Sequence, residues 1–423
     1  MTARRFMRFE DFVEINPRVR LEKGESYPFI EMELVTPEYR YVRPRGEREF
    51  KSGGAKFQSQ DTLFARITPC LENGKIAQVV DLPGGIGFGS TEFFVFRAIP
   101  DISDPAYVYY LASTSIIRGP AEKSMSGASG RQRVDLSAIK ELEVLAPDLE
   151  TQQKIAAILS AYDDLIENNL WRIKILEEMA RNLYREWFVK FRFPCHAKVR
   201  MVDSPLGKIP EGWEIVSIDD VATVHRGRSY RSKDLVDDGG LPFVNLKCID
   251  RDGGFRRNGL KRYVGKYKET QKVVSGDIVM AVTDMTQERR IVARAGRVPT
   301  LDSDFGVISM DLVKIEPREG ISPDYLYGYF RGSDFADNVK QQANGANVLH
   351  LSPDRIKEYQ FVLPSKVMRD RFTAFSGLVF KDVENLNHRN EILRKTRDLL
   401  LPKLISGELD VSELEINTGK KAA

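Results

Sequence analysis

The sequence predicts an α+β protein with two similar mixed domains, separated by two long helices that form an antiparallel coiled coil. The first observation is an internal repeat, in which YPFIEMELV at 27–35 matches LPFVNLKCI at 241–249, and IKELEVLAP at 139–147 matches IKEYQFVLP at 356–364. The second observation is that a long amphipathic stretch follows each copy. Because the repeat is far longer than the roughly 20–50 residues of a solenoid unit, it indicates a duplicated domain and a pseudo-two-fold arrangement.

Each copy of the repeat predicts a globular domain, at residues 1–148 and 207–365. In the first domain, the runs TLFARI and TEFFVFRAI are typical of strands, and the glycine-rich segments KSGGAK and LPGGIGFGS are typical of turns. A short amphipathic helix is expected at DPAYVYYLAST, with a counterpart at SPDYLYGYFRGS. We therefore expect both domains to share one fold.

Two long helices are expected at 149–190 and 366–406. The first begins with Pro147, Asp148 and Glu150, which are residue types that favour a helix start. Helices of this length span about 60 Å at ~1.5 Å per residue, so neither fits inside a domain of this size. The remaining segments are a linker at 191–206 and a tail at 407–423, whose end LEINTGKKAA is expected to be frayed.

The first long helix carries seam residues at alternating spacings of three and four, which is the pattern of a coiled coil. Asn169 has a counterpart, Asn390, in the second helix, and antiparallel pairing places the two opposite each other. A buried polar pair disfavours slipped registers. One position differs in kind, because Arg397 stands where the first helix has Ala180. This register predicts the pairs Leu159 with Leu400, Ile166 with Leu393, Ile173 with Leu386, Leu176 with Val383, and Trp187 with Phe372.

Composition indicates an ordinary soluble chain of 423 residues, 42% hydrophobic and 30% charged. No apolar run approaches the ~18 residues of a membrane span, and the three cysteines lack metal-binding spacing, so we expect a cytoplasmic protein without a membrane.

The net charge is only +3, but residues 224–300 hold 17 Lys and Arg against 9 Asp and Glu, and residues 40–75 hold 8 against 4. Two basic segments at matching positions predict phosphate-binding surfaces.

Motifs for catalysis are missing from the sequence. There is no G-x-x-x-x-G-K-[ST] phosphate loop, no Asn/Asp-Pro-Pro-aromatic methyltransferase tetrapeptide, and no metal-ligand spacing among the four histidines. We therefore expect no catalytic, cofactor or metal site in this chain. A nuclease site made of scattered carboxylates stays open at this point.

Residues that read duplex DNA are better represented, because arginine pairs with guanine, and asparagine or glutamine with adenine. They gather in a loop after one strand of each repeat, and in a glycine-rich loop before each long helix. The predicted DNA-binding residues are Arg43, Arg45, Lys51, Arg66, Asn73, Arg131, Gln132 and Arg133 in the first repeat, and Arg226, Arg228, Arg231, Arg256, Arg257, Lys261, Arg262, Gln287, Arg289, Arg290, Asn344 and Asn347 in the second.

The whole chain resembles the specificity subunit of a type I restriction–modification system. The resemblance is carried by GDIVMAVTDMT, by SGASGRQRVDLSAIKELEVLAPDLETQQKIAAILSAYDDLIENNLWRIKILEEMARNLYREWF, by DSPLGKIPEGWEI and by LRKTRDLLLPKLISGEL. It implies two target-recognition domains that read a bipartite DNA site, and spacer helices that dock two modification subunits holding S-adenosylmethionine. It also implies a motor–nuclease subunit that uses ATP and Mg.

Three alternatives remain at this point. The partner could be a fused nuclease–methyltransferase rather than separate subunits. A self-contained nuclease or methyltransferase is disfavoured by the missing motifs, and a purely structural dimerising coiled coil by the two large basic domains. The loops of the two domains differ strongly, so the full DNA site is expected to be asymmetric.

Overall fold

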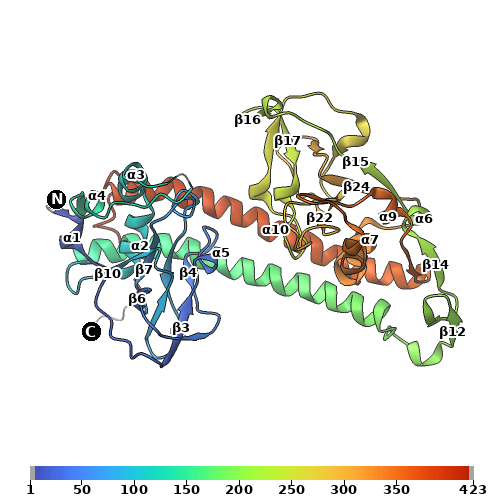
Figure 1. The fold of residues 1–423 in the computed structure, drawn as a ribbon, viewed down its shortest axis with the longest axis horizontal. Helices are drawn as coiled ribbons and strands as arrows, with labels where there is room; N and C mark the ends of the chain where they lie inside the picture. The colour runs from blue at the N-terminus through green and yellow to red at the C-terminus, as the bar shows by residue number, and fades with distance from the viewer. Residues whose placement is uncertain (1–4, 129, 419–423) are drawn as a thin grey trace. The chain divides into compact units, whose positions relative to one another are not determined.

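The computed structural model describes residues 5–128 and 130–418, and the chain forms two compact units. The first unit joins Met1–Leu170 to His388–Ala423, and the second is Trp171–Asn387. Each unit holds one mixed α/β domain and a part of each long helix (Figure 1). Within the described ranges, no helix is long and apolar enough to cross a membrane.

The domain of the first unit is built on two sheets. All four residues of the central strand β7 are buried, because helix α2 (Pro105–Ser113) packs against this sheet. Asp104 caps α2 by accepting a hydrogen bond from Ala106 N at 2.9 Å. One sheet has the order β2 (Val13–Ile15), β10 (Phe93–Ala98), β7 (Thr62–Ala65), β8 (Ile76–Val79), β4 (Tyr41–Val42), and the other β5 (Glu47–Glu49), β3 (Ser26–Ile30), β9 (Ile86–Gly89), β6 (Ala55–Gln58). The remaining elements are β1 (Arg5–Arg8), which pairs with β11 (Glu143–Ala146), and the helices α1 (Phe9–Phe12), α3 (Ser115–Lys123) and α4 (Ser137–Lys140).

The domain of the second unit repeats this plan. Its central strand β20 is fully buried, and helix α7 (Pro323–Gly332) is capped by Ser322, whose hydroxyl accepts from Asp324 N at 3.2 Å. One sheet has the order β15 (Ala222–Arg226), β24 (Leu312–Pro317), β20 (Ile278–Ala281), β22 (Ala295–Arg297), and the other β16 (Leu235–Val236), β18 (Lys261–Tyr263), β17 (Leu241–Val244), β23 (Gly306–Ile308), β19 (Lys272–Val273). Smaller pairs are β12 (Met201–Ser204) with β13 (Gly207–Pro210), β14 (Glu214–Ser217) with β26 (Gln360–Leu363), and β21 (Thr283–Asp284) with β25 (Leu349–His350), beside the helices α6 (Ile218–Val221), α8 (Phe335–Val339) and α9 (Pro353–Lys357).

Strand registers confirm that the two domains share one fold. In the first unit Ala65 of β7 lies opposite Phe93 of β10, and in the second Ala281 of β20 lies opposite Leu312 of β24. These are equivalent positions of the sequence repeat, so the repeat extends to individual residue pairs.

The long helices are α5 (Leu149–Tyr184) and α10 (Lys366–Ile405). Asp148 caps α5, since its Oδ1 accepts a hydrogen bond from Thr151 N at 2.7 Å. A π-helical turn, Arg185–Val189, follows α5 directly. Residues up to Leu170 of α5 and from His388 of α10 belong to the first unit, and the rest of both helices belongs to the second.

In the first unit, Asn169 Nδ2 donates a hydrogen bond to Asn390 Oδ1 at 2.9 Å. Asn390 Nδ2 in turn donates to the carbonyl of Ile166 at 3.4 Å. The two asparagines are 8% and 1% exposed, so the buried polar pair predicted from the heptad pattern is confirmed. The remaining predicted seam residues are buried or half-buried, namely Leu159, Ile166, Ile173, Leu176, Trp187, Val383, Leu386, Leu393 and Leu400.

The prediction that Trp187 meets Phe372 is wrong in detail. The ring of Phe372 lies 5.5 Å from the rings of both Tyr184 and Phe188, which are buried, while Trp187 is half-buried and packs 6.0 Å from Phe188. A straight helix has 3.6 residues per turn, so its buried face drifts away from a strict heptad. The π-helical turn at Arg185–Val189 adds a further local rotation.

Arg397 makes one layer of the helix pair in the first unit ionic. Its guanidinium pairs with Asp163, whose side chain is only 4% exposed. Tyr110 of α2 donates its hydroxyl proton to Asp163 at 2.6 Å, and Arg40 donates to the Tyr110 oxygen at 3.1 Å. This layer therefore ties α2, α5 and α10 together within the first unit.

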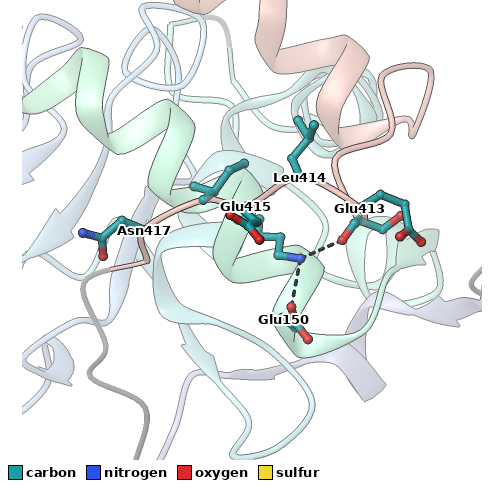
Figure 2. A pocket seen from close by; sticks show the side chains of 8 residues that line it. Glu150, Glu413, Leu414, Glu415 and Asn417 are labelled. Carbon is teal, nitrogen blue, oxygen red and sulfur yellow. Dashed lines mark hydrogen bonds and ion pairs between the residues drawn. The ribbon is translucent and has the colours of Figure 1, made fainter.

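The segment after α10 is anchored before the predicted frayed end, LEINTGKKAA, of which Leu414 is 51% exposed, so the fraying stays a prediction. Val411 is 1% exposed, and Ile416 packs against the same apolar core as the start of α5. Lys154 of α5 donates to the carbonyl of Ser412 at 2.6 Å and pairs with Glu150 at 2.8 Å (Figure 2). Burial of apolar surface at Val411 and Ile416 stabilises the segment locally; residues 419–423 lie outside the described residues.

Candidate nucleic-acid interface

In the first unit, two loops predicted to read DNA are joined by hydrogen bonds. One follows β7 at 66–75, and the other is the glycine-rich loop at 126–133, of which residue 129 lies outside the described residues. Thr68 N donates to Gln132 O at 3.0 Å, and Gln132 N donates back to Thr68 Oγ1 at 3.0 Å. We call these two loops the first paired-loop site.

The second unit contains the equivalent arrangement, the second paired-loop site, made of the loops 282–293 and 344–350. Its loops are joined as strands, since β21 pairs with β25 with Thr283 opposite His350. Gln287 reinforces the junction by donating its amide N–H to Ala346 O at 2.9 Å. The amide of Gln287 therefore holds the loops together, a role that its prediction as a base reader did not include.

The two sites match at the level of single hydrogen bonds. Val134 N donates to Arg66 O at 2.9 Å in the first site, and Leu351 N donates to Val282 O at 2.8 Å in the second. Because these backbone hydrogen bonds are equivalent and the side chains differ, the sites carry different side-chain chemistry on similarly paired loops.

Glu92 organises the arginines of the first paired-loop site. Its carboxylate accepts from Arg133 twice, from Nη2 at 2.7 Å and from Nε at 3.0 Å, and from Arg66 Nε at 3.4 Å. These bonds, first among them those from Arg133, lower the pKa of Glu92 and keep it ionised. Glu92 was missing from the predicted site; a carboxylate directly before a strand and beside two basic loops was the available signal.

Asp311 is the counterpart of Glu92 in the second unit, because it precedes β24 as Glu92 precedes β10. It has no arginine at the matching positions, where Val282 and His350 stand in place of Arg66 and Arg133. Its carboxylate instead accepts from Thr283 Oγ1 at 3.2 Å. The carboxylate therefore recurs in both units, while its basic partners occur only in the first.

Two predicted DNA-binding arginines pair with carboxylates of the long helices instead. Arg43 donates to Glu167 of α5 at 2.6 Å and to Asp81 at 2.7 Å. Arg257 pairs with Glu384 of α10, which is the repeat counterpart of Glu167. These equivalent ion pairs attach each domain to a helix of its own unit, and the prediction that the two arginines contact DNA stays a prediction.

Most other predicted DNA-binding side chains are accessible. Arg289 donates to the neutral amide oxygen of Gln341 at 3.0 Å and keeps its charge. Some of the positive charge is compensated locally, since Arg262 pairs with Asp302 and Arg133 pairs with Glu92. The local charge counts therefore overstate the free positive charge. Exposed are Arg45, Lys51, Asn73, Arg131, Arg133, Arg226, Arg231, Arg256, Lys261, Gln287, Arg290, Asn344 and Asn347, and partly buried are Arg66, Gln132, Arg228, Arg257, Arg262 and Arg289.

The described part of the chain contains no group of three or more His, Cys, Asp or Glu side chains suited to holding a metal ion. The side-chain chemistry of the two paired-loop sites is that of hydrogen bonding and ion pairing.

Comparison with known proteins adds three findings. A family model described as a type I restriction modification DNA specificity domain matches residues 6–178 and 210–371. The chain is similar to the MjaIX type I restriction enzyme specificity subunit of Methanocaldococcus jannaschii, with 27% identity over 316 residues that cover 73% of this chain and 70% of that protein. It is also similar to the HindI type I restriction enzyme specificity subunit of Haemophilus influenzae, with 23% identity over 414 residues, covering 82% and 86%. Its fold resembles that of the type I restriction–modification system S subunit from M. genitalium, with a TM-score of 0.52, 16% identity and 96% of both chains covered.

Proposed function

The chain belongs to the type I restriction–modification DNA specificity family, and we propose that its two paired-loop sites each read one half of a split, asymmetric DNA site. The observation that carries the proposal is the repeat of one loop geometry, once per unit, with different side chains at matching positions. One example is Arg133 in the first site, which is matched by His350 in the second. Similarly paired loops that carry different side chains at matching positions favour two half-sites of different base sequence.

The same family membership supports a role within a larger complex. We propose that modification subunits carrying S-adenosylmethionine dock on α5 and α10, and that motor–nuclease subunits supply ATP- and Mg-dependent cleavage. Both helices support docking because each exposes large apolar side chains, which are common at protein interfaces. These are Leu165, Trp171, Ile175 and Met179 on α5, and Leu378, Ile392 and Leu399 on α10.

Two triple alanine variants test whether each paired-loop site reads its own half of the DNA site. The chain is expressed with its own partner subunits in a host free of other methylation, and the methylated motif is sequenced. Replacing Gln287, Arg289 and Arg290 with Ala should alter only the half-site read by the second unit. Replacing Arg131, Gln132 and Arg133 with Ala should alter only the other half.

Each triple variant is the matched control of the other, because the untouched half of the motif reports that the complex is intact. Both half-sites changing together in either variant would contradict the proposal that the two sites read independently.

A further inference from the structure

Arg133 is held in a fixed orientation at the first paired-loop site. Glu92 occupies the Nε–Nη2 edge of its guanidinium with two bonds, at 3.0 Å and 2.7 Å, and Arg133 nevertheless remains 48% exposed. Glu92 itself is only 20% exposed and sits directly before β10. A two-point contact from a nearly covered carboxylate on a strand end removes most of the rotational freedom of the arginine.

The geometry of guanidinium leaves a second fork for another partner. Arginine has five N–H donors, and a carboxylate on the Nε–Nη2 edge uses two of them. The Nη1–Nη2 edge carries a parallel pair of N–H groups. Guanine presents O6 and N7 in the major groove as two adjacent acceptors, which this edge matches.

Charge decides between a base and a phosphate as the partner of Arg133. A carboxylate at hydrogen-bond distance cancels much of the attraction between the arginine and a phosphate. The same carboxylate fixes the direction of the free donors, which matters for reading a base edge. Arg66 also donates to Glu92, at 3.4 Å. Arg66, Arg133 and Glu92 together carry a net charge of +1, which still attracts DNA.

We propose that Arg133 reads a guanine in the first half-site through its Nη1–Nη2 edge, and that Glu92 is the positioning residue that aims it. This inference rests on the proposed function of the paired-loop sites. Glu92 acts through Arg133 and does not touch the base. The second unit has no arginine at the matching positions, because Val282 and His350 stand in place of Arg66 and Arg133 there.

Two variants distinguish the effect of the orientation of the Arg133 guanidinium from the effect of its charge. Glu92→Gln keeps the size of the side chain but loses the carboxylate, and Arg133→Lys keeps the charge but loses the fork. With the chain in complex with its modification subunits, both should reduce discrimination at one and the same G·C pair of the first half-site. The expected reduction is roughly 5- to 150-fold, the range of a bidentate base contact. Asp311→Asn, the equivalent change in the second unit, is the matched control and should leave every position of the first half-site unchanged.

Binding to non-specific duplex separates a positioning role from a structural one. Glu92→Gln should bind such a duplex as well as the unmodified chain or better, because it removes a negative charge next to DNA. Equal loss of specific and non-specific binding, together with a lower melting temperature, would show that Glu92 only stabilises the loops and would overturn the proposal.

The remaining outcomes also decide the question. Relaxation at an A·T pair, or at different positions in the two variants, would overturn the assignment of guanine to Arg133. An unchanged motif in both variants would overturn it as well, provided that the Arg131, Gln132 and Arg133 triple variant still alters the first half-site. If the triple variant also leaves that half intact, it is the proposed function that fails.

Discussion

Glu92 and Asp311 hold the same position in the two repeats, and a serine hydroxyl two residues earlier accepts a hydrogen bond from the backbone N–H of each. The distances are 3.2 Å to Ser90 and 3.3 Å to Ser309. The local turn is therefore retained while the partners of the carboxylate differ. The two substitutions opposite the retained carboxylate, Val282 for Arg66 and His350 for Arg133, therefore change the side-chain chemistry of the second paired-loop site.

The cysteines provide a residue-scale prediction about reactivity. Cys248 is buried, and burial raises the pKa of its thiol to about 12, whereas Cys195 is exposed. Only the thiolate is nucleophilic, so an alkylating reagent at about pH 8 should modify Cys195 and spare Cys248 in the folded protein. Peptide mass spectrometry measures this, with denatured protein as the control. Equal labelling of both cysteines in the folded state would contradict the buried position of Cys248.

The same thiol predicts a direction for stability against pH. The folded pKa of Cys248 lies above its ordinary value of 9.0, so the unfolded chain loses this proton first as pH rises. The contribution of Cys248 is therefore complete below that ordinary value and is lost as pH rises through the folded value. Cys248→Ala should flatten the alkaline decline in stability of the second unit, as measured by thermal unfolding at a series of pH values.

At the scale of elements, the helix pair carries different chemistry in the two units. The ionic layer of Asp163 and Arg397 in the first unit corresponds in the repeat to Phe380 and Ala180 in the second, which are both buried in an apolar core. Gly328 stands where the first unit has Tyr110, and any side chain there would collide with Phe372. The same backbone plan is therefore stabilised by charge in one unit and by aromatic packing in the other.

Removing one member of the ionic layer deprives the other of its partner across the helix pair, although Asp163 keeps the hydrogen bond from Tyr110 and Arg397 keeps Asp398. Arg397→Met and Asp163→Leu should each lower the free energy of unfolding of the first unit by about 3–5 kcal/mol. The double variant should recover part of that loss, because it removes both members of the ion pair together, while the buried Arg40 nearby remains. Urea unfolding of the four proteins measures the coupling, and Leu399→Met, at an exposed position of α10, is the control, with an expected change below about 0.5 kcal/mol. Strictly additive losses would show that the two side chains do not act as a pair.

At the scale of the whole molecule, each long helix belongs partly to both units, so we expect the helices to set the gap between the half-sites. Four residues inserted after Leu176, and four between Asp382 and Val383, preserve the register that Asn169 and Asn390 define. Each insertion adds about one turn, ~5.4 Å, so at ~3.4 Å per base pair the unread gap should widen by one to two pairs. Sequencing of the methylated motif measures the gap. Retention of the original gap would show that the length of the helices does not set the spacing between the half-sites.

Binding by the isolated chain supplies a second whole-molecule prediction. The purified chain should neither methylate nor cleave DNA, and its affinity should fall steeply with salt, because phosphate contacts release counterions. Arg131→Ala and Arg45→Ala, at exposed positions of the first unit, should each reduce the salt slope by about one if they contact phosphates. Fluorescence anisotropy at several salt concentrations measures this. Methyl transfer from S-adenosylmethionine by the chain alone would contradict the assignment.

Consecutive residues were sufficient to predict the duplication, the two long helices and the asparagine pair. Those features depend on periodicity and on local propensity, which a sequence displays directly. The pairing of Asn169 with Asn390 followed from heptad spacing alone, and the structure has the two amides in contact. The resemblance to the specificity family followed from motifs that are likewise contiguous.

Contacts between side chains that are distant in the sequence depend on the packing of the folded chain. Glu92 with Arg133, and Arg257 with Glu384, join residues far apart in the chain, and their geometry depends on how strands and loops pack in three dimensions. Spacing along a sequence says nothing about such distances, so it indicates neither the ion pair of Arg257 with Glu384 nor the role of Glu92 beside Arg133. The rings of Tyr184 and Phe188, and not that of Trp187, pack against Phe372. The drift of a straight helix from the heptad repeat and the π-helical turn determine which of these rings is buried.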